Sequence, residues 1–505
     1  MFVRKKKNKS GVISIQVIDK SSGKYKVIKT IGSSADASKV EHFYQRALFE
    51  LPKLTGQSEI NFDIEKEEAL IKMFFESIEE LKLIGPELVL GKLFNEIGFN
   101  AIRDELFRHL VITRMVYPVS KLKTIDYLYK YKNIYIEKDK IYRYLDKLNN
   151  KYKKQLQQIS YHHTLSILNN NISVVFYDVT TLYFEIEDED DLRRTGFSKE
   201  GKHQQPQIVL GLLVSLDGYP LAYEIFDGKK FEGHTMLPVI ESFKKEFSLQ
   251  QLVIVADAGL LSNDNIQELQ NKGYEYILGA RIKNETRNIQ KQILSLRLQN
   301  GESAAIQKDD CTKIIIAYSS SRAKKDEANR KRGLQKLEQA ISSGKLSKKN
   351  INNRGYNKYL KIEGEINIKI DYDKYKADAC WDGLKGYITN TKLSNSEIID
   401  NYSHLWNIEK AFRISKTDLK VRPIYHRLKS RIEAHLCIAF CAYKVYKELE
   451  RQLKIKQADI SAEKTIEILK TIYALTIRTP YSKKLQTKRI IKKSEQEFIL
   501  QIFEV

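Results

Sequence analysis

The segment "ISVVFYDVTTLYFEI" (residues 172–186) decides the fold, because the helical periodicity of the preceding chain ends where it begins. Its β-branched and aromatic residues predict a long strand. "QIVLGLLVSLDG" (207–218) and "YPLAYEIF" (219–226) follow, and they predict two more strands of an antiparallel meander.

Beyond this meander the pattern alternates between helix and strand. "HTMLPVIESFKKEF" (234–247) predicts a helix and "LVIVADAG" (252–259) predicts a buried strand. Residues 262–273 predict a second helix, with Ser262 as its N-cap, and "YEYILGAR" (274–281) predicts a fifth strand. Three antiparallel strands, helix, strand, helix, strand is the element order of a ribonuclease-H-like α/β fold with a mixed five-stranded sheet.

The rest of the chain divides around this core. We expect an N-terminal β element (1–35), a helical region (36–165), the ribonuclease-H-like core (166–281 and 387–445), a β-rich insertion that interrupts the core (282–386) and a helical C-terminal region (446–505). The helical region 36–165 is basic and rich in tyrosine, which suits a DNA-binding domain. A helical scaffold is an equally good interpretation.

Composition limits the partners. With 86 Lys and Arg against 64 Asp and Glu, the chain has a net charge of +22, which favours a polyanionic partner such as nucleic acid. Its richness in Lys, Ile, Asn and Tyr is also typical of AT-rich genomes, so charge alone does not decide. No apolar run approaches the length of a membrane span, and no signal sequence is visible, so we expect a cytoplasmic protein without a membrane partner. Cys437 and Cys441 predict buried thiols on an apolar helix.

Three acids occupy related positions in the predicted core. Asp178 lies within the first strand, Asp257 ends the fourth strand, and Glu409 lies on the helix after the insertion. In a ribonuclease-H-like sheet the first and fourth strands are neighbours and that helix packs across them, so the carboxylates should converge. Converging carboxylates repel one another, and hard divalent cations such as Mg²⁺ or Mn²⁺ relieve the repulsion. Two such ions can activate a nucleophile and stabilise the leaving oxygen of a phosphodiester.

Each acid also has a simpler interpretation. An aspartate that ends a strand is often a turn residue, and Glu409 is spaced to form an intrahelical ion pair with Arg413. The metal site is favoured because all three acids fall in the right elements, in the right order, in a basic chain.

A basic run follows Glu409. From Lys410 to Arg431 the chain has eight Lys or Arg and one acid, Asp418. Tyr402, Glu409 and Lys416 are spaced seven apart and should share one helix face. Leu405, Ile408, Phe412 and Leu419 form the expected core stripe beside them. The cations would hold DNA against the metal ions, and backbone charge would supply most of the affinity. The predicted DNA-binding residues are Tyr402, Arg413, Lys416, Lys420 and Arg422.

At these residues the chain resembles the DDE transposases of bacterial insertion sequences, in the subgroup with a Y-x2-R-x3-E-x6-K signature. Tyr402, Glu409 and Lys416 match the signature, whereas Leu405 stands where an arginine is expected and Arg413 is the candidate to replace it. "YDVTTLYFE", "GFSKEGK", "ADAGLLS" and the N-terminal "FVRKKKNKSG" are also similar to this family, so the resemblance covers nearly the whole chain.

The resemblance implies that Asp178, Asp257 and Glu409 hold two Mg²⁺ or Mn²⁺ ions. It also implies a homodimer that assembles on the terminal inverted repeats of the element, hydrolyses DNA at its ends and joins the freed 3′-hydroxyl to double-stranded target DNA. Two alternatives remain: an inactive or domesticated transposase that binds DNA without cutting it, and a metal-dependent nuclease without strand transfer.

Overall fold

The computed structural model describes residues 1–55, 62–185, 188–196, 204–230, 232–247, 249, 252–260, 262–344, 346, 352, 355–363, 367–479 and 482–505. The chain forms two compact units, which are described separately. One comprises Met1–Glu80 with Leu475–Lys488, and the other comprises Leu81–Ala474 with Arg489–Val505. The second unit contains every residue predicted for the site.

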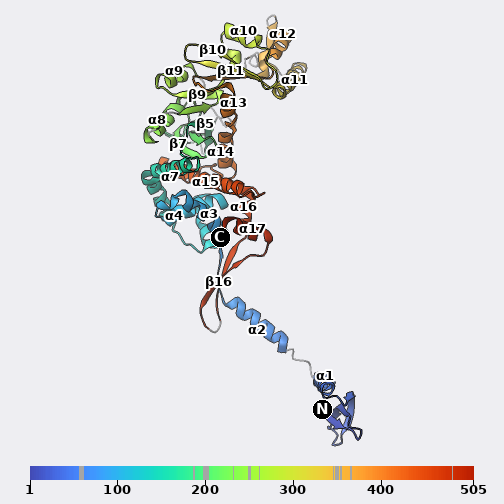
Figure 1. Ribbon diagram of the computed structural model, residues 1–505. Coiled ribbons are helices and arrows are strands. Elements are labelled where there is room, and N and C mark those ends of the chain that lie inside the picture. The colour runs from blue at the N-terminus through green and yellow to red at the C-terminus, as the bar shows by residue number, and fades with distance from the viewer. Residues whose placement is uncertain are drawn as a thin grey trace. The chain divides into compact units, whose positions relative to one another are not determined.

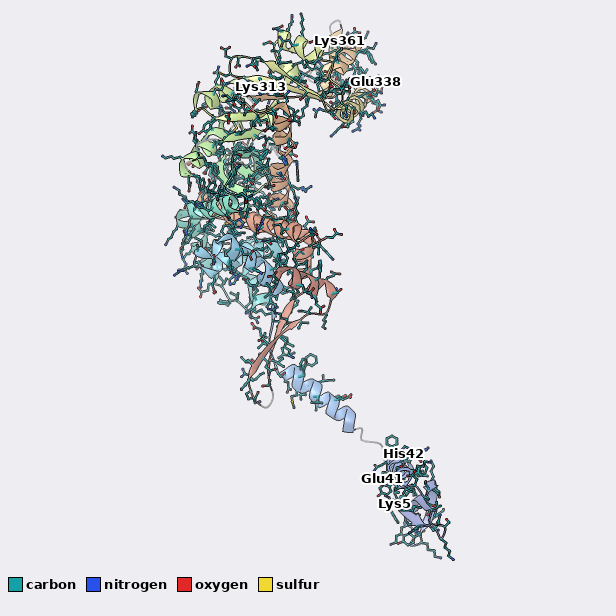
Figure 2. The ribbon with its side chains drawn as sticks, viewed as in Figure 1. Lys5, Glu41, His42, Lys313, Glu338 and Lys361 are labelled. Atoms are coloured by element: carbon teal, nitrogen blue, oxygen red, sulfur yellow. The ribbon has the colours of Figure 1, made fainter. Side chains whose placement is uncertain are left out.

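The first unit begins with an antiparallel sheet. Its strands are β1 (Phe2–Lys7), β2 (Ile13–Asp19) and β3 (Lys26–Ser34), with β2 in the middle. Helix α1 (Ala37–Thr55) packs on this sheet through the buried Val40 and Ala47. The ammonium of Lys5 on β1 lies 2.9 Å from the carboxylate of Glu41 on α1 (Figure 2). The N-terminal β element expected from the sequence is confirmed.

A second small sheet pairs a strand at residues 78–83 with two strands near the C-terminus. Its strands, in spatial order, are β16 (Leu485–Ile490), β15 (Tyr473–Arg478) and β4 (Ile78–Leu83), and α2 (Phe62–Glu76) precedes β4. Helices α16 (Ala462–Leu469) and α17 (Ser494–Phe503) flank the two C-terminal strands in sequence. The region 446–505, for which we expected helices, therefore also contains strands. The alternation of "YALTIR" in β15 is the sequence signal for them.

The core is the predicted ribonuclease-H-like sheet. Its five strands are β5 (Val174–Tyr183), β6 (Gln207–Ser215), β7 (Pro220–Asp227), β8 (Val253–Ala256) and β9 (Glu275–Ala280). They lie in the order β9-β8-β5-β6-β7, with β6 antiparallel to β5 and β7, and with β5, β8 and β9 mutually parallel. The predicted fold class is confirmed.

The sheet continues beyond β9, which the sequence did not predict. The added strands are β14 (Leu384–Thr389), β11 (Lys313–Tyr318) and β10 (Ser303–Gln307), which make the sheet eight-stranded. β14 pairs antiparallel with β9 and places Tyr387 opposite Gly279. The segment 282–386 thus contributes strands to the core sheet as well as elements of its own. Those elements are α10 (Arg287–Ser295), α11 (Ser320–Ser342), the β12–β13 hairpin (Leu360–Glu363 and Asn367–Ile370) and α12 (Tyr372–Ala377).

Helices cover both faces of the sheet. On one face, Val175 and Ile254 share an apolar cluster with α8 (Met236–Phe247) and α9 (Asn263–Asn271). On the other face, Phe176 and Val255 share a cluster with α13 (Asn395–Ser403) and α14 (Trp406–Thr417). Figure 1 shows α8 and α9 on one side of the strands and α13 and α14 on the other. Alternate residues of each strand therefore point to different helices.

A long buried helix connects the sheet to a helical layer. α15 (Lys429–Ile455) carries the buried thiols of Cys437 and Cys441, as predicted. The layer consists of α3 (Gly85–Ile97), α4 (Glu105–Val116), α5 (Lys121–Lys132), α6 (Lys138–Lys147) and α7 (Lys153–Ile167). These helices share the large apolar cluster of α15. Among the described residues, no helix combines the length and apolar character needed to cross a bilayer.

Candidate metal and DNA site

Two of the three predicted acids lie on neighbouring parallel strands. Tyr177 of β5 pairs with Ala256 of β8. Asp178 is the residue after Tyr177 and Asp257 is the residue after Ala256, so the two acids lie at the same level of the sheet. Asp178 is in phase with Phe176, and Asp257 is in phase with Val255, and both apolar residues belong to the cluster under α13 and α14. Because strand side chains alternate between faces, the two carboxylates share the face that these helices cover.

Asp257 is held by a short turn and by a tyrosine. Its Oδ1 accepts a hydrogen bond from the backbone amide of Ala258 at 2.7 Å. The same oxygen accepts one from the hydroxyl of Tyr402 on α13 at 3.3 Å. Burial raises the pKa of the Tyr402 hydroxyl, and the negative Asp257 beside it acts in the same direction. Tyr402 therefore stays protonated and remains a donor to the carboxylate.

The Tyr402 ring fits a seat formed by β9 and β14. It lies edge-on to the ring of Tyr387, with centroids 4.8 Å apart, and the ammonium of Lys385 lies 4.4 Å from its centre. Gly279, opposite Tyr387, leaves room for the hydroxyl, since a Cβ there would lie 2.5 Å from it. A Cβ at this position would therefore displace either the Tyr402 hydroxyl or the turn at Ala258.

Glu409 of α14 acts electrostatically on the residues of the same seat. Burial lowers the pKa of Lys385, and Arg322 acts in the same direction, whereas Asp257 and Glu409 oppose the shift. Glu409 also adds to the negative charge that acts on the Tyr402 hydroxyl. Lys385 and Tyr402 are thus within electrostatic range of both Asp257 and Glu409. In the described part of the chain, Glu409 forms no ion pair with Arg413.

The donor set suits a hard divalent cation, because all three groups are carboxylates. As their side chains lie, however, no three His, Cys, Asp or Glu residues of the described ranges come close enough together to hold a metal ion. Asp178 and Asp257 are adjacent on one sheet face, and Glu409 projects from the helix that covers it.

The helix that carries the signature is broken. The sequence predicted one helix through Tyr402 and Glu409, but α13 and α14 are separated by a turn at His404 and Leu405. The four residues of the predicted core stripe are all buried. Leu405, where the related signature has arginine, is one of them, so a charged side chain at this position would be buried too.

The five predicted DNA-binding residues lie in different environments. Arg413 and Lys420 are exposed, and Lys416 and Arg422 are half-buried. The Arg422 guanidinium lies 5.4 Å from the centre of the Tyr183 ring. Tyr402 is only 6% exposed, and its hydroxyl is used by Asp257.

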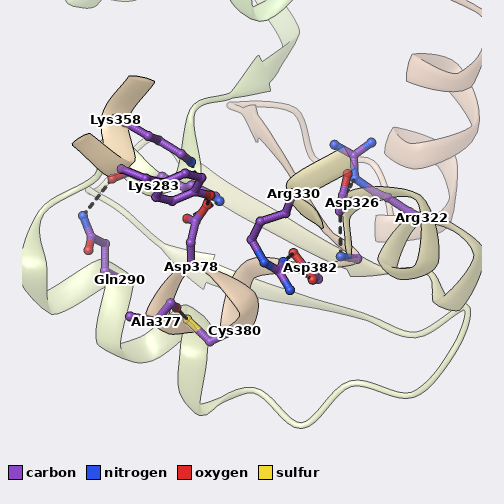
Figure 3. Close-up of polar contacts among 12 residues, drawn as sticks. Lys283, Gln290, Arg322, Asp326, Arg330, Lys358, Ala377, Asp378, Cys380 and Asp382 are labelled. Atoms are coloured by element: carbon purple, nitrogen blue, oxygen red, sulfur yellow. Dashed lines mark hydrogen bonds and ion pairs between the residues drawn. The ribbon is translucent and has the colours of Figure 1, made fainter. Parts of the chain in front are cut away.

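An ion-pair network joins different segments of the insertion to one another. Lys283 and Lys358 both contact the Asp378 carboxylate, at 2.7 and 2.6 Å, and Arg330 pairs with Asp382 (Figure 3). Arg322, at the start of α11, lies 3.5 Å from Asp326.

Lys385, Tyr387 and Gly279 are site residues that no sequence motif marks. Lys385 and Tyr387 lie in the strand "LKGYIT", whose pattern does not reveal its partner strand, and Gly279 lies in β9, the strand that turns out to be that partner.

These features place the protein in the ribonuclease-H-like class, with acids on the sheet face that is covered by the helix after an insertion. The sequence model of the family described as "Transposase DDE domain" matches residues 169–444, more than half of the chain, so the chain belongs to that family. Nuclease and transesterification chemistry and dependence on divalent metal ions are general properties of this family. The family motif "GFSKEGK" lies almost wholly outside the described residues.

Other comparisons add little. No curated protein matches the chain. Among solved structures, a piggyBac transposase synaptic complex with hairpin DNA, determined by cryo-EM, is 11% identical and covers 77% of this chain and 79% of that chain, with a TM-score of 0.37. Similarity at this level supports no argument about the fold or the activity.

Proposed function

We propose that this transposase binds the terminal inverted repeats of an insertion sequence as a homodimer, cleaves the DNA at the element ends and transfers the 3′ ends to target DNA. The observation that carries the proposal is the shared sheet face of Asp178 and Asp257, with Glu409 on the helix that covers it. We also propose that the chain belongs to the bacterial subgroup whose signature contains the tyrosine, the glutamate and the lysine.

In this mechanism Asp178, Asp257 and Glu409 hold two Mg²⁺ or Mn²⁺ ions, and the proposal requires the three carboxylates to approach one another on binding. Such ions supply activation of the attacking oxygen and stabilisation of the leaving oxygen. Tyr402 orients Asp257 through its hydrogen bond, because burial keeps its hydroxyl protonated. Lys385 lies within electrostatic range of both Asp257 and Glu409, so its positive charge offsets part of their negative charge in the absence of metal.

The cations after Glu409 hold the DNA. Arg413, Lys416, Lys420 and Arg422 would contact backbone phosphates, which position the duplex without reading its sequence. Removing one such contact lowers the steepness of the salt dependence by about 0.9 for duplex DNA.

The test is cleavage of DNA that carries the flanking element ends, with Mg²⁺ or Mn²⁺ present. Asp178→Asn and Glu409→Gln should abolish nicking at the element ends and leave DNA binding largely intact. Asp264→Asn, an exposed acid on α9, is the matched control and should cleave normally. Unchanged cleavage by either site variant would remove these residues from the mechanism. Nicking without joined products would favour the nuclease alternative.

A further inference from the structure

A second site is indicated by a cationic cavity on the helical layer. The cavity, of about 550 Å³, lies between the start of α5 and the loop that follows α14. Its cationic lining residues are Arg114, Lys121, Lys123, Lys420 and Arg422, and two histidines, His426 and His435, also line it. Among the described residues that line it, none is acidic.

Lys121 is the unusual residue of this cavity. It is the first residue of α5 and only 4% exposed. Within the described chain its ammonium has neither a hydrogen-bond partner nor an ion-pair partner. Burial lowers the pKa of Lys121, and Arg114 acts in the same direction. A buried ammonium is costly unless an anion pairs with it, so an anion bound in the cavity would favour the charged form of Lys121.

The side chains of Arg114 and His435 beside Lys121 are held by hydrogen bonds that involve no carboxylate. The buried Arg114 donates from Nη1 to the carbonyls of Leu419 and Lys420, both at 3.5 Å, and its Nη2 lies 3.2 Å from Nδ1 of His435. Nε2 of His435 lies 2.8 Å from the carbonyl of Val421. Backbone carbonyls thus orient the arginine and the histidine but do not neutralise the positive charge.

The nearby acid is already occupied. Asp146 acts electrostatically on His426, which also lines the cavity. Its carboxylate accepts hydrogen bonds from Arg431 and from the Ser430 hydroxyl, each at 3.0 Å. Burial and the surrounding cations lower the pKa of His426 to about 3, so this histidine stays neutral. The 12-residue helix α5 also directs the positive end of its dipole to this place.

We propose that this cavity binds a phosphate group, with Lys121 as its charge partner, and that the occupant is a backbone phosphate of DNA. Lys420 and Arg422 belong both to the cavity wall and to the basic run that begins after Glu409, so a strand held along that run reaches the cavity. The choice of DNA rests on the proposed function, whereas the phosphate site itself does not.

The phosphate site is tested by thermal unfolding of the full chain in potassium phosphate and in potassium chloride of equal ionic strength. A ligand that binds only the folded state raises the unfolding midpoint. The wild type and Lys130→Met should show the rise, and Lys121→Met should lose it. Lys130 is an exposed lysine on the same helix, outside the cavity. No rise in the wild type would overturn the site and leave the proposed function untouched.

If Lys121→Met does not fold, Lys420→Asn replaces it. The backbone of Lys420 has φ of 43°, which asparagine tolerates, so this change removes a lining charge without backbone strain. It should reduce the phosphate-dependent rise, and an undiminished rise would overturn the site.

The DNA assignment is tested by fluorescence anisotropy with a duplex that carries an element end, over a series of salt concentrations. Lys121→Met should lower the slope of log Kobs against log salt by about 0.9, and Lys130→Met should leave it unchanged. Loss of the phosphate effect with an unchanged slope would mean a site for free phosphate and would overturn the DNA assignment. A wild type that does not bind the duplex would defeat the proposed function and the DNA assignment, while the phosphate experiment would still decide the site.

Discussion

Gly279 is expected to be irreplaceable because Tyr402 lies directly over it. A Cβ at this position would lie 2.5 Å from the Tyr402 hydroxyl and 3.0 Å from the amide nitrogen of Ala258. The tyrosine has little room to retreat, since its ring packs against Tyr387 and under the Lys385 ammonium. Gly279→Ala must therefore displace either Tyr402 or the turn that carries Asp257. Overpacking of this kind costs about 2 kcal/mol of unfolding free energy.

A second substitution isolates the contact. Tyr402→Phe removes the hydroxyl, which loses the hydrogen bond to Asp257 at a cost of about 1 kcal/mol. It also removes the nearest atom to the new Cβ at position 279, although the contact with Ala258 remains. In the Tyr402→Phe background, Gly279→Ala should thus cost at least about 1 kcal/mol less than in the wild type.

Urea unfolding followed by tryptophan fluorescence measures these costs in the right part of the molecule. The chain has two tryptophans, Trp381 and Trp406, and both lie in the unit that contains the site. The free energies from the four proteins give the coupling between positions 279 and 402. Strictly additive costs would refute the placement of the Tyr402 hydroxyl over β9.

Three further predictions concern other parts of the chain. Leu405→Arg should lower the unfolding free energy by about 3 kcal/mol or more, because position 405 is buried; an unchanged urea midpoint would contradict this. Burial alone would raise the pKa of Asp378, but Lys283, Lys358 and Tyr359 hold it well below its usual value. This stabilisation is present above about pH 4, the usual pKa of an aspartate, and is lost as the pH falls below it, so the stability gap between wild type and Asp378→Asn should shrink between about pH 4 and 3; a constant gap would argue against it. Lys416→Ala should weaken DNA binding and lower the salt slope by about 0.9, and an unaltered slope would place Lys416 on a solvated face instead.

The sequence predicted the parts of the fold that local pattern determines. The β-branched and aromatic residues of β5 to β9 predict strands. The order of these strands along the chain predicts that Asp178 and Asp257 are neighbours in the sheet. The same reasoning could not place β14, because a short alternating segment does not say which sheet edge it joins.

Contacts between segments that are distant in the sequence could not be predicted either. Tyr402 was predicted to face DNA from its spacing with Glu409, but its seat depends on Gly279 and Tyr387, which only the pairing of β9 with β14 brings together. The cationic cavity likewise assembles residues of α4, α5, α15 and the loop after α14. Charge counts along the sequence do not distinguish Lys121, which is buried, from the exposed Lys123 beside it.

The central claim is that one pair of divalent ions is shared by carboxylates from β5, from the end of β8 and from α14. The most direct measurement is a crystal structure of the protein with Mn²⁺ and DNA that carries an element end, with the ions located by their anomalous scattering. Anomalous peaks within about 2.2 Å of carboxylate oxygens of Asp178, Asp257 and Glu409 are the expected result. Ions bound elsewhere, with Glu409 still apart from the two aspartates, would contradict it.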